Sequence, residues 1–87
     1  MKSFIFGVDV DSKACQICVK DLSKRTLLNQ KIHNLELTAF VENRLIKAFP
    51  PQETLVVMES TGKSYYLFPK HVFERFGYEV RVENPRF

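Results

Sequence analysis

The sequence predicts an α/β fold built on a mixed β-sheet. Two continuous apolar runs, residues 4–10 and 55–58, are typical of strands buried on both faces. Between them, two segments alternate apolar and polar residues, which indicates half-exposed strands. Helical periodicity follows over residues 35–48 and again over residues 64–76. With one more short strand at the end, the expected element order is β-β-β-α-β-α-β.

Length and composition restrict the class of protein further. The chain has 87 residues, which is enough for one small domain. Hydrophobic residues make up 45% and charged residues 26%, so a packed core is expected and disorder is not. The net charge of +3 is compatible with a nucleic-acid partner but does not indicate one by itself. No apolar run approaches the roughly 20 residues of a membrane-spanning helix.

The first three strands are expected to form an antiparallel meander. We predict strands over residues 3–10, 14–20 and 25–32, joined by short polar turns. In the second strand, apolar and polar residues alternate, so its two cysteines three positions apart face opposite sides. That geometry does not suit a shared metal or a disulfide, and we expect Cys15 and Cys18 to be ordinary thiols in a reducing cytoplasm.

Two helices and two further strands complete the pattern. Asn34 is the expected N-cap of the first helix, which ends before Pro50. The fourth strand covers residues 54–58, and Gly77 fits the left-handed position after the second helix, before a strand over residues 78–82. The expected buried stripes of the two helices are Leu37, Phe40, Val41, Leu45 and Ala48 in the first, and Phe68, Val72 and Phe76 in the second.

Chain connectivity then predicts the sheet. The two late strands each follow a helix, and right-handed crossovers make such strands parallel to the first. We expect the first strand to lie in the centre, between the second and the fourth. Three antiparallel strands followed by parallel ones form the ribonuclease H-like arrangement.

Two carboxylates stand at the ends of the two most apolar strands. Asp9 lies near the end of the first run and Glu59 follows the second, so both are expected at the same edge of the sheet. Two neighbouring carboxylates repel each other, and a divalent cation removes that repulsion. Hard oxygen ligands favour Mg²⁺ or Mn²⁺. Asp9 and Glu59 are therefore the predicted catalytic and metal-binding residues, with Asp11 as a weaker third ligand.

The segment after the fourth strand contains small, basic and aromatic residues. Its TGKS stretch lacks the first glycine of a phosphate-binding loop, because Val57 occupies that position. Backbone amides at a helix start still contact phosphates, and an aromatic ring beside a basic residue stacks on bases. The expected nucleic-acid contacts are Lys13, Thr61, Gly62, Lys63 and Tyr65.

Three motifs in register resemble those of a known family. GVDVDSK, VVMESTG and YEVRVENPR resemble, in this order, the N-terminal part of the DEDD transposases, the insertion-sequence group that includes the pilin-gene invertases. That family has a RuvC-like, ribonuclease H-fold catalytic domain, and the resemblance covers nearly the whole chain. Carried over, Asp9 matches the first family acid and Glu59 the second.

The resemblance implies a function and a set of partners. It implies DNA transposition and recombination with Mg²⁺ or Mn²⁺, assembly into homo-oligomers, binding to DNA and in some members a structured RNA, and a bacterial cytoplasmic location. The family's last two acids and a catalytic serine lie beyond the NPR segment. Residues 1–87 are therefore expected to be the N-terminal portion of such a catalytic domain, inactive alone.

Two other function classes stay open. An actin-like or sugar-kinase nucleotide-binding fragment shares the opening strands and a GxDxG phosphate turn, but Asp11 replaces the second glycine. A non-catalytic nucleic-acid-binding module would use a basic face. The residues expected on that face are Lys13, Lys20, Lys24, Arg25 and Lys63.

Overall fold

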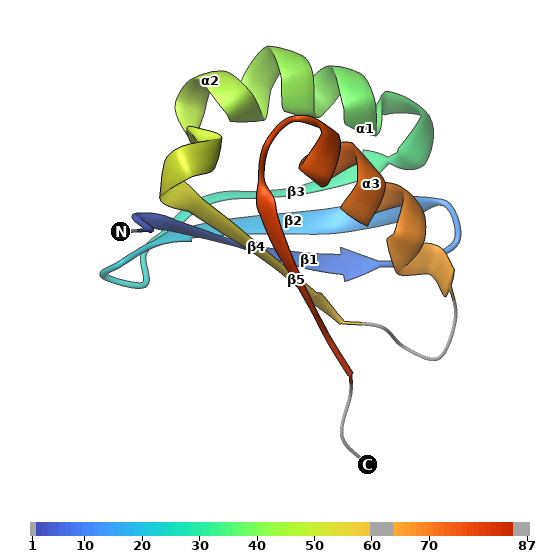
Figure 1. Ribbon diagram of the computed structural model, residues 1–87, viewed down its shortest axis with the longest axis horizontal. Helices are drawn as coiled ribbons and strands as arrows, with labels where there is room; N and C mark the ends of the chain where they lie inside the picture. Colours follow the sequence, from blue (N-terminus) through green and yellow to red (C-terminus); the bar gives the residue numbers. More distant parts are fainter. Residues whose placement is uncertain (1, 60–63, 85–87) are drawn as a thin grey trace.

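One five-stranded sheet, covered on one face by helices, organises the part of the chain that the structure describes (Figure 1). This computed structural model describes residues 2–59 and 64–84. The strand order is β3-β2-β1-β4-β5. The strands are β1 Phe4–Val10, β2 Ala14–Asp21, β3 Thr26–His33, β4 Thr54–Glu59 and β5 Glu79–Glu83.

The strand pairing confirms the expected mixed sheet. β1 pairs antiparallel with β2, and β2 pairs antiparallel with β3. β4 pairs parallel with β1 on one side and with β5 on the other. Gly7 lies opposite Val57 and Val8 opposite Met58, so the two most apolar runs are neighbours and β1 is central. The expected element order is confirmed.

The first helical segment covers residues 34–48 and contains a wider turn. It consists of α1 Asn34–Phe40, a π-helical turn η1 Val41–Leu45, and α2 Ile46–Ala48. The predicted N-cap, Asn34, is wrong by one residue. His33 caps the helix, because its Nδ1 accepts a hydrogen bond from the Leu35 amide at 3.1 Å.

The buried stripe of this helix matches the expected one except at its end. The side chains of Leu37, Phe40, Val41 and Leu45 are buried against the sheet, as expected. Ala48 is exposed, in contrast to the prediction. α2 ends at this residue, and the next residue, Phe49, leaves the helix with φ −134° and ψ 90° and is buried.

The second helix starts later than the periodicity suggested. A short 3₁₀ turn, η3 Ser64–Tyr66, precedes α3 Leu67–Arg75. Val72 faces the core as expected, together with Phe73, while Phe68, predicted to be inside, has 45% of its surface exposed. Gly77 adopts φ +93°, which confirms its expected left-handed position after the helix.

An aromatic cluster forms the centre of the core. The ring of Phe6 lies 5.6 Å from Phe49, 6.0 Å from Phe73 and 5.3 Å from Tyr78, measured between centroids. The Tyr78 hydroxyl donates a hydrogen bond of 2.7 Å to the Phe49 carbonyl oxygen. Burial raises the pKa of Tyr78 to about 12, so the hydroxyl keeps its proton and remains a donor at neutral pH.

The two cysteines lie on opposite faces of β2, as expected. Cys15 is buried under the helices and Cys18 is half-buried on the other face, and both are free thiols. Burial raises the pKa of Cys15 to about 11, which keeps that sulfur protonated.

No helix among residues 2–59 and 64–84 has the length and apolar character needed to cross a bilayer.

The two phenylalanines of α3 provide a test of this packing. Phe73→Ala removes a fully buried ring and is expected to lower the free energy of unfolding by about 3–5 kcal/mol. The matched change Phe68→Ala removes a half-exposed ring and is expected to cost less than about 1 kcal/mol. Urea denaturation followed by circular dichroism measures both. Equal losses would contradict the assigned helix phase.

Candidate functional site

The carboxyl ends of β1 and β4 place two acids side by side. Val8 and Met58 are opposite each other, and both are buried under the helices. Side chains alternate along a strand, so the next residues, Asp9 and Glu59, emerge on the face without helices. Both acids are exposed there. Neighbouring strands are about 4.8 Å apart, so the two acids are neighbours on that face.

Two further polar side chains extend this pair into a row across the sheet. Gln16 on β2 lies opposite Asp9, and Glu83 on β5 lies opposite Glu59. The amide of Gln16 is held in place because its Nε2 donates to Asn29 Oδ1 at 2.7 Å. The row therefore runs Gln16, Asp9, Glu59, Glu83, and three of its four members are acids.

The sequence reasoning missed Glu83. The last strand was expected to end at residue 82, whereas β5 continues to Glu83 and pairs that residue with Glu59. The available signal was the alternation of Glu79, Val80, Arg81, Val82 and Glu83. In a strand parallel to β4, this alternation puts both glutamates on the same face as Glu59.

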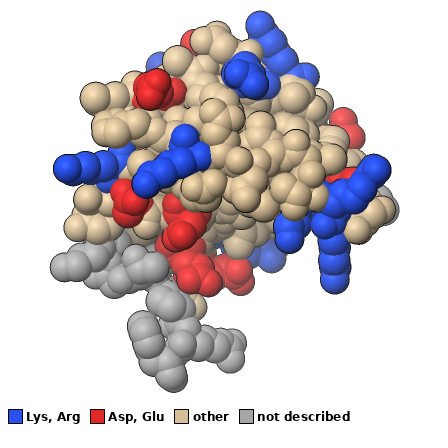
Figure 2. Space-filling view, turned by 180° about the vertical axis from the view of Figure 1, so that it is seen from behind, with Lys and Arg blue, Asp and Glu red and all other residues tan. Residues whose placement is uncertain are grey.

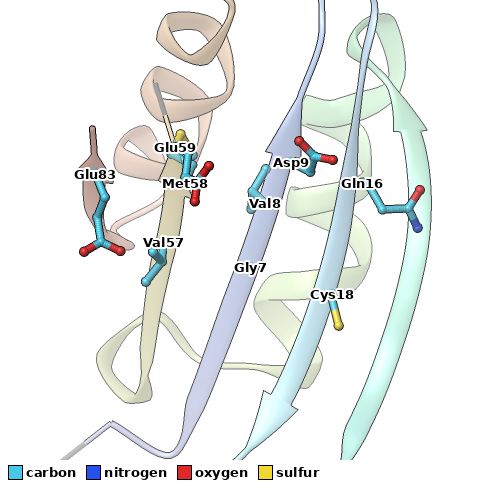
Figure 3. A pocket seen from close by; sticks show the side chains of 9 residues that line it. All are labelled: Gly7, Val8, Asp9, Gln16, Cys18, Val57, Met58, Glu59 and Glu83. Carbon is cyan, nitrogen blue, oxygen red and sulfur yellow. The ribbon is translucent and has the colours of Figure 1, made fainter. Parts of the chain in front are cut away.

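The row borders an open pocket of about 460 Å³ on the uncovered face of the sheet (Figure 3). Gly7 and Val57 lie opposite each other, two residues before Asp9 and Glu59 on the same face, and line part of this pocket. A Cβ added at Gly7 would lie 3.9 Å from the Cys18 carbonyl oxygen, an ordinary contact. A side chain therefore fits at this position, and glycine leaves the space open. Figure 3 shows Glu83, Glu59, Asp9 and Gln16 arranged in this order across four strands.

Asp11 belongs to the turn after β1. Its Oδ1 accepts hydrogen bonds from the amides of Lys13 and Ala14, both at 2.8 Å. These two bonds lower the pKa of the Asp11 carboxyl. One oxygen of this carboxylate therefore stabilises the turn, and the same two amides are not free to hold a phosphate. The metal-binding role of Asp11 stays a prediction.

The expected nucleic-acid contacts are only partly visible. Lys13 is exposed in the turn between β1 and β2, and Tyr65 has 42% of its surface exposed in η3. Thr61, Gly62 and Lys63 lie outside the described residues. The structure thus places two of the five contacts on the surface and does not test their role.

The acids at this site fit one mode of metal binding. Within the described residues, no three His, Cys, Asp or Glu side chains form a group that could hold a metal ion. A closed cage made of protein ligands is therefore not present in that part of the chain. Mg²⁺ is commonly held by one or two carboxylates, with water and phosphate oxygens as its other ligands. Asp9 and Glu59 fit that second mode.

The comparisons with known proteins concern the fold. No protein-family model and no curated protein matches the chain. Among solved structures, an exopolyphosphatase from Cytophaga hutchinsonii has a similar fold, with a TM-score of 0.54 and 13% identity. The match covers 93% of this chain and 34% of that protein, so the chain spans about a third of its length. A Ppx/GppA phosphatase from Aquifex aeolicus matches at 14% identity and a TM-score of 0.48, over 94% of this chain and 36% of that one.

The similarity to the exopolyphosphatase corrects the family expected from the sequence. The fold matches an exopolyphosphatase, so the assignment to the DEDD transposases is wrong, and with it the function in DNA transposition. The prediction of a RuvC-like catalytic domain is wrong for the same reason. Each of the three motifs is short and overlaps one strand of the sheet, β1, β4 or β5. Apolar runs are common to buried strands in many folds, so such motifs do not identify one family.

The Asp11 turn predicts a pH dependence. Its folded-state pKa is depressed below the ordinary 3.8, so the stabilisation is complete above that pH. It is lost as the pH falls through the lower, folded-state pKa. In NMR titrations we expect the Lys13 and Ala14 amide shifts to move together with a midpoint below 3.8. Asp11→Asn should abolish this transition, and a wild-type midpoint at or above 3.8 would contradict the turn.

Proposed function

We propose that this chain binds a phosphoanhydride ligand, a nucleotide or a polyphosphate, through a divalent cation held by Asp9 and Glu59. The reaction class is hydrolysis or transfer of a phosphoryl group. The observation that carries the proposal is the position of the two acids, which end adjacent parallel strands on an open face above a pocket. Open α/β sheets bind their ligands at this place.

Electrostatics at the site require the cation. Asp9, Glu59 and Glu83 give the pocket rim a negative charge, which repels a phosphate. A divalent ion between Asp9 and Glu59 reverses this effect, and we propose Mg²⁺ or Mn²⁺ because all the ligands are hard oxygens. When bound, such an ion neutralises charge on a phosphoryl oxygen. Asp9 and Glu59 hold it, and Gln16 supplies a polar amide beside Asp9.

The fold similarity bears on which arrangement this sheet belongs to. Both the ribonuclease H-like and the actin-like arrangements contain a sheet of this strand order, and we propose the actin-like one. Its support is the match to an exopolyphosphatase, a protein whose name describes action on polyphosphate. An identity of 13% supports the fold alone, so the ligand class rests on the acids and the pocket.

Binding to nucleic acid has weaker support. Lys13 lies in the turn at one end of β2, while Lys20, Lys24 and Arg25 lie near its other end. Arg25 also pairs with Asp21 at 3.1 Å. The face seen in Figure 2 has acidic side chains gathered at its lower left and centre and a group of lysines and arginines at its lower right, with others dispersed elsewhere. These residues do not form a single basic face, and contacts with DNA or RNA stay predictions.

Calorimetry with matched variants tests the proposal. Asp9→Asn and Glu59→Gln keep the shape of each side chain and remove its charge. We expect wild-type protein to bind Mg²⁺ and Mn²⁺, and each variant to bind at least roughly tenfold more weakly, which is about 1.4 kcal/mol. Glu42→Gln is the control, because Glu42 is exposed on the helical layer, away from the site.

The second part of the test uses phosphate compounds. With Mg²⁺ present, ATP and tripolyphosphate are expected to bind the wild type and the Glu42→Gln control, and to bind the two site variants more weakly. Metal binding that is equal in all four proteins would refute the cation site. Metal binding without any binding of ATP or tripolyphosphate would refute the ligand class.

A further inference from the structure

β5 is an edge strand with an unusual charge pattern. It stands at the end of the strand order, so its outer backbone groups have no strand partner within the described residues. Such an edge pairs readily with another strand. On the uncovered face it carries Glu79, Arg81 and Glu83, while Val80 and Val82 face the helices and are half-buried.

Only one of these three charges is neutralised within the described chain. Lys2 Nζ lies 3.3 Å from Glu79 Oε1. Arg81 and Glu83 take part in no ion pair with any residue in 2–59 or 64–84. The same face of this edge strand therefore presents two exposed, opposite charges, at Arg81 and Glu83.

We propose that a second copy of this chain pairs with β5 as an antiparallel strand, with Val82 opposite Val82 of the second copy. In this register Arg81 lies opposite Glu83 of the second copy, and Glu83 lies opposite its Arg81. Opposite charges in direct cross-strand positions stabilise a pair, and like charges destabilise it. The two-fold symmetry thus produces two ion pairs from one Arg and one Glu.

The alternative registers are less complementary. Complete overlap of the two strands puts Arg81 opposite Arg81 and Glu79 opposite Glu83, which brings like charges together. A shift in the other direction puts Arg81 opposite Glu79. In that register, Arg81 of the second copy competes with Lys2 for the carboxylate of Glu79. The register centred on Val82 uses the two charges that the described chain leaves without an ion pair.

The opposite edge of the sheet does not offer the same match. On the uncovered face, β3 carries Leu27, Asn29, Lys31 and His33, which include no acid. Pairing β3 with its own copy therefore brings together cationic and neutral groups only. Charge complementarity selects β5 as the edge that pairs with itself, and the assembly closes as a dimer.

This pairing also changes the candidate site. Glu83 borders the pocket, so Arg81 of the second copy arrives at the pocket rim beside Glu83. Each copy thereby gives its partner a guanidinium group near Asp9 and Glu59, and guanidinium binds phosphate oxygens well. This consequence for ligand binding rests on the proposed function. The strand pairing does not, and its test uses no phosphate.

Analytical ultracentrifugation of charge-reversed variants tests the dimer. A pairing of one short strand is small, so we expect a dissociation constant on the order of 100 μM for the wild type. Glu83→Arg and Arg81→Glu each place like charges opposite each other and should weaken the dimer at least about tenfold. The double variant R81E/E83R exchanges the two charges and should restore it. Circular dichroism establishes that each variant is folded.

A matched control variant tests whether the two strands pair in the proposed register. Glu79→Arg changes a charge on the same strand that is not part of the proposed pairs, so the dimer should persist. Loss of the dimer in Glu79→Arg, or failure of R81E/E83R to restore it in folded protein, would overturn the register. A wild type that stays monomeric at about 1 mM, or forms larger species instead of a dimer, would overturn the proposal.

Discussion

The aromatic cluster around Phe6 is the constraint on which the rest of the structure depends. It joins β1 to Phe49, which precedes β4, to Phe73 in α3, and to Tyr78, which precedes β5. Each ring pair contributes roughly 0.5–1.5 kcal/mol beyond the burial of its area. The hydrogen bond from Tyr78 to the Phe49 carbonyl fixes the approach of two chain segments 29 residues apart.

The aromatic cluster and the acids of the candidate site lie at opposite ends of the strands. Phe6, Phe49 and Tyr78 all lie toward the amino ends of β1, β4 and β5, where helix and strand pack tightly. Asp9, Glu59 and Glu83 stand at or near the carboxyl ends of the same strands, on the other face (Figure 3). The core at one end therefore holds the acids in a row and leaves them exposed.

The strand arrangement follows from the sequence because its signals are local. Apolar runs and alternation located all five strands, and chain connectivity gave the parallel pairing of β1 with β4. The position of Asp9 and Glu59 at strand ends followed from the same runs.

Other features depend on details that a pattern does not contain. Apolar residues occur at helical spacing on more than one side of α3, and the structure buries Phe73 and leaves Phe68 half-exposed. The cap of α1 depends on where β3 ends, which gives the role to His33. The assignment to the DEDD transposases was wrong because the motifs that suggested it are short and follow the strands of the sheet. Different proteins with this sheet share such strands.

Paramagnetic NMR with Mn²⁺ tests the central claim most directly, since it locates a bound ion without requiring activity. The account predicts that substoichiometric Mn²⁺ broadens the amide signals of Asp9, Glu59 and their neighbour Gln16 first. Signals of the aromatic cluster at the other end of the strands should change little, and excess Mg²⁺ should reverse the effect by competition. Broadening centred on other acids, or spread evenly over the surface, would contradict a cation site between β1 and β4.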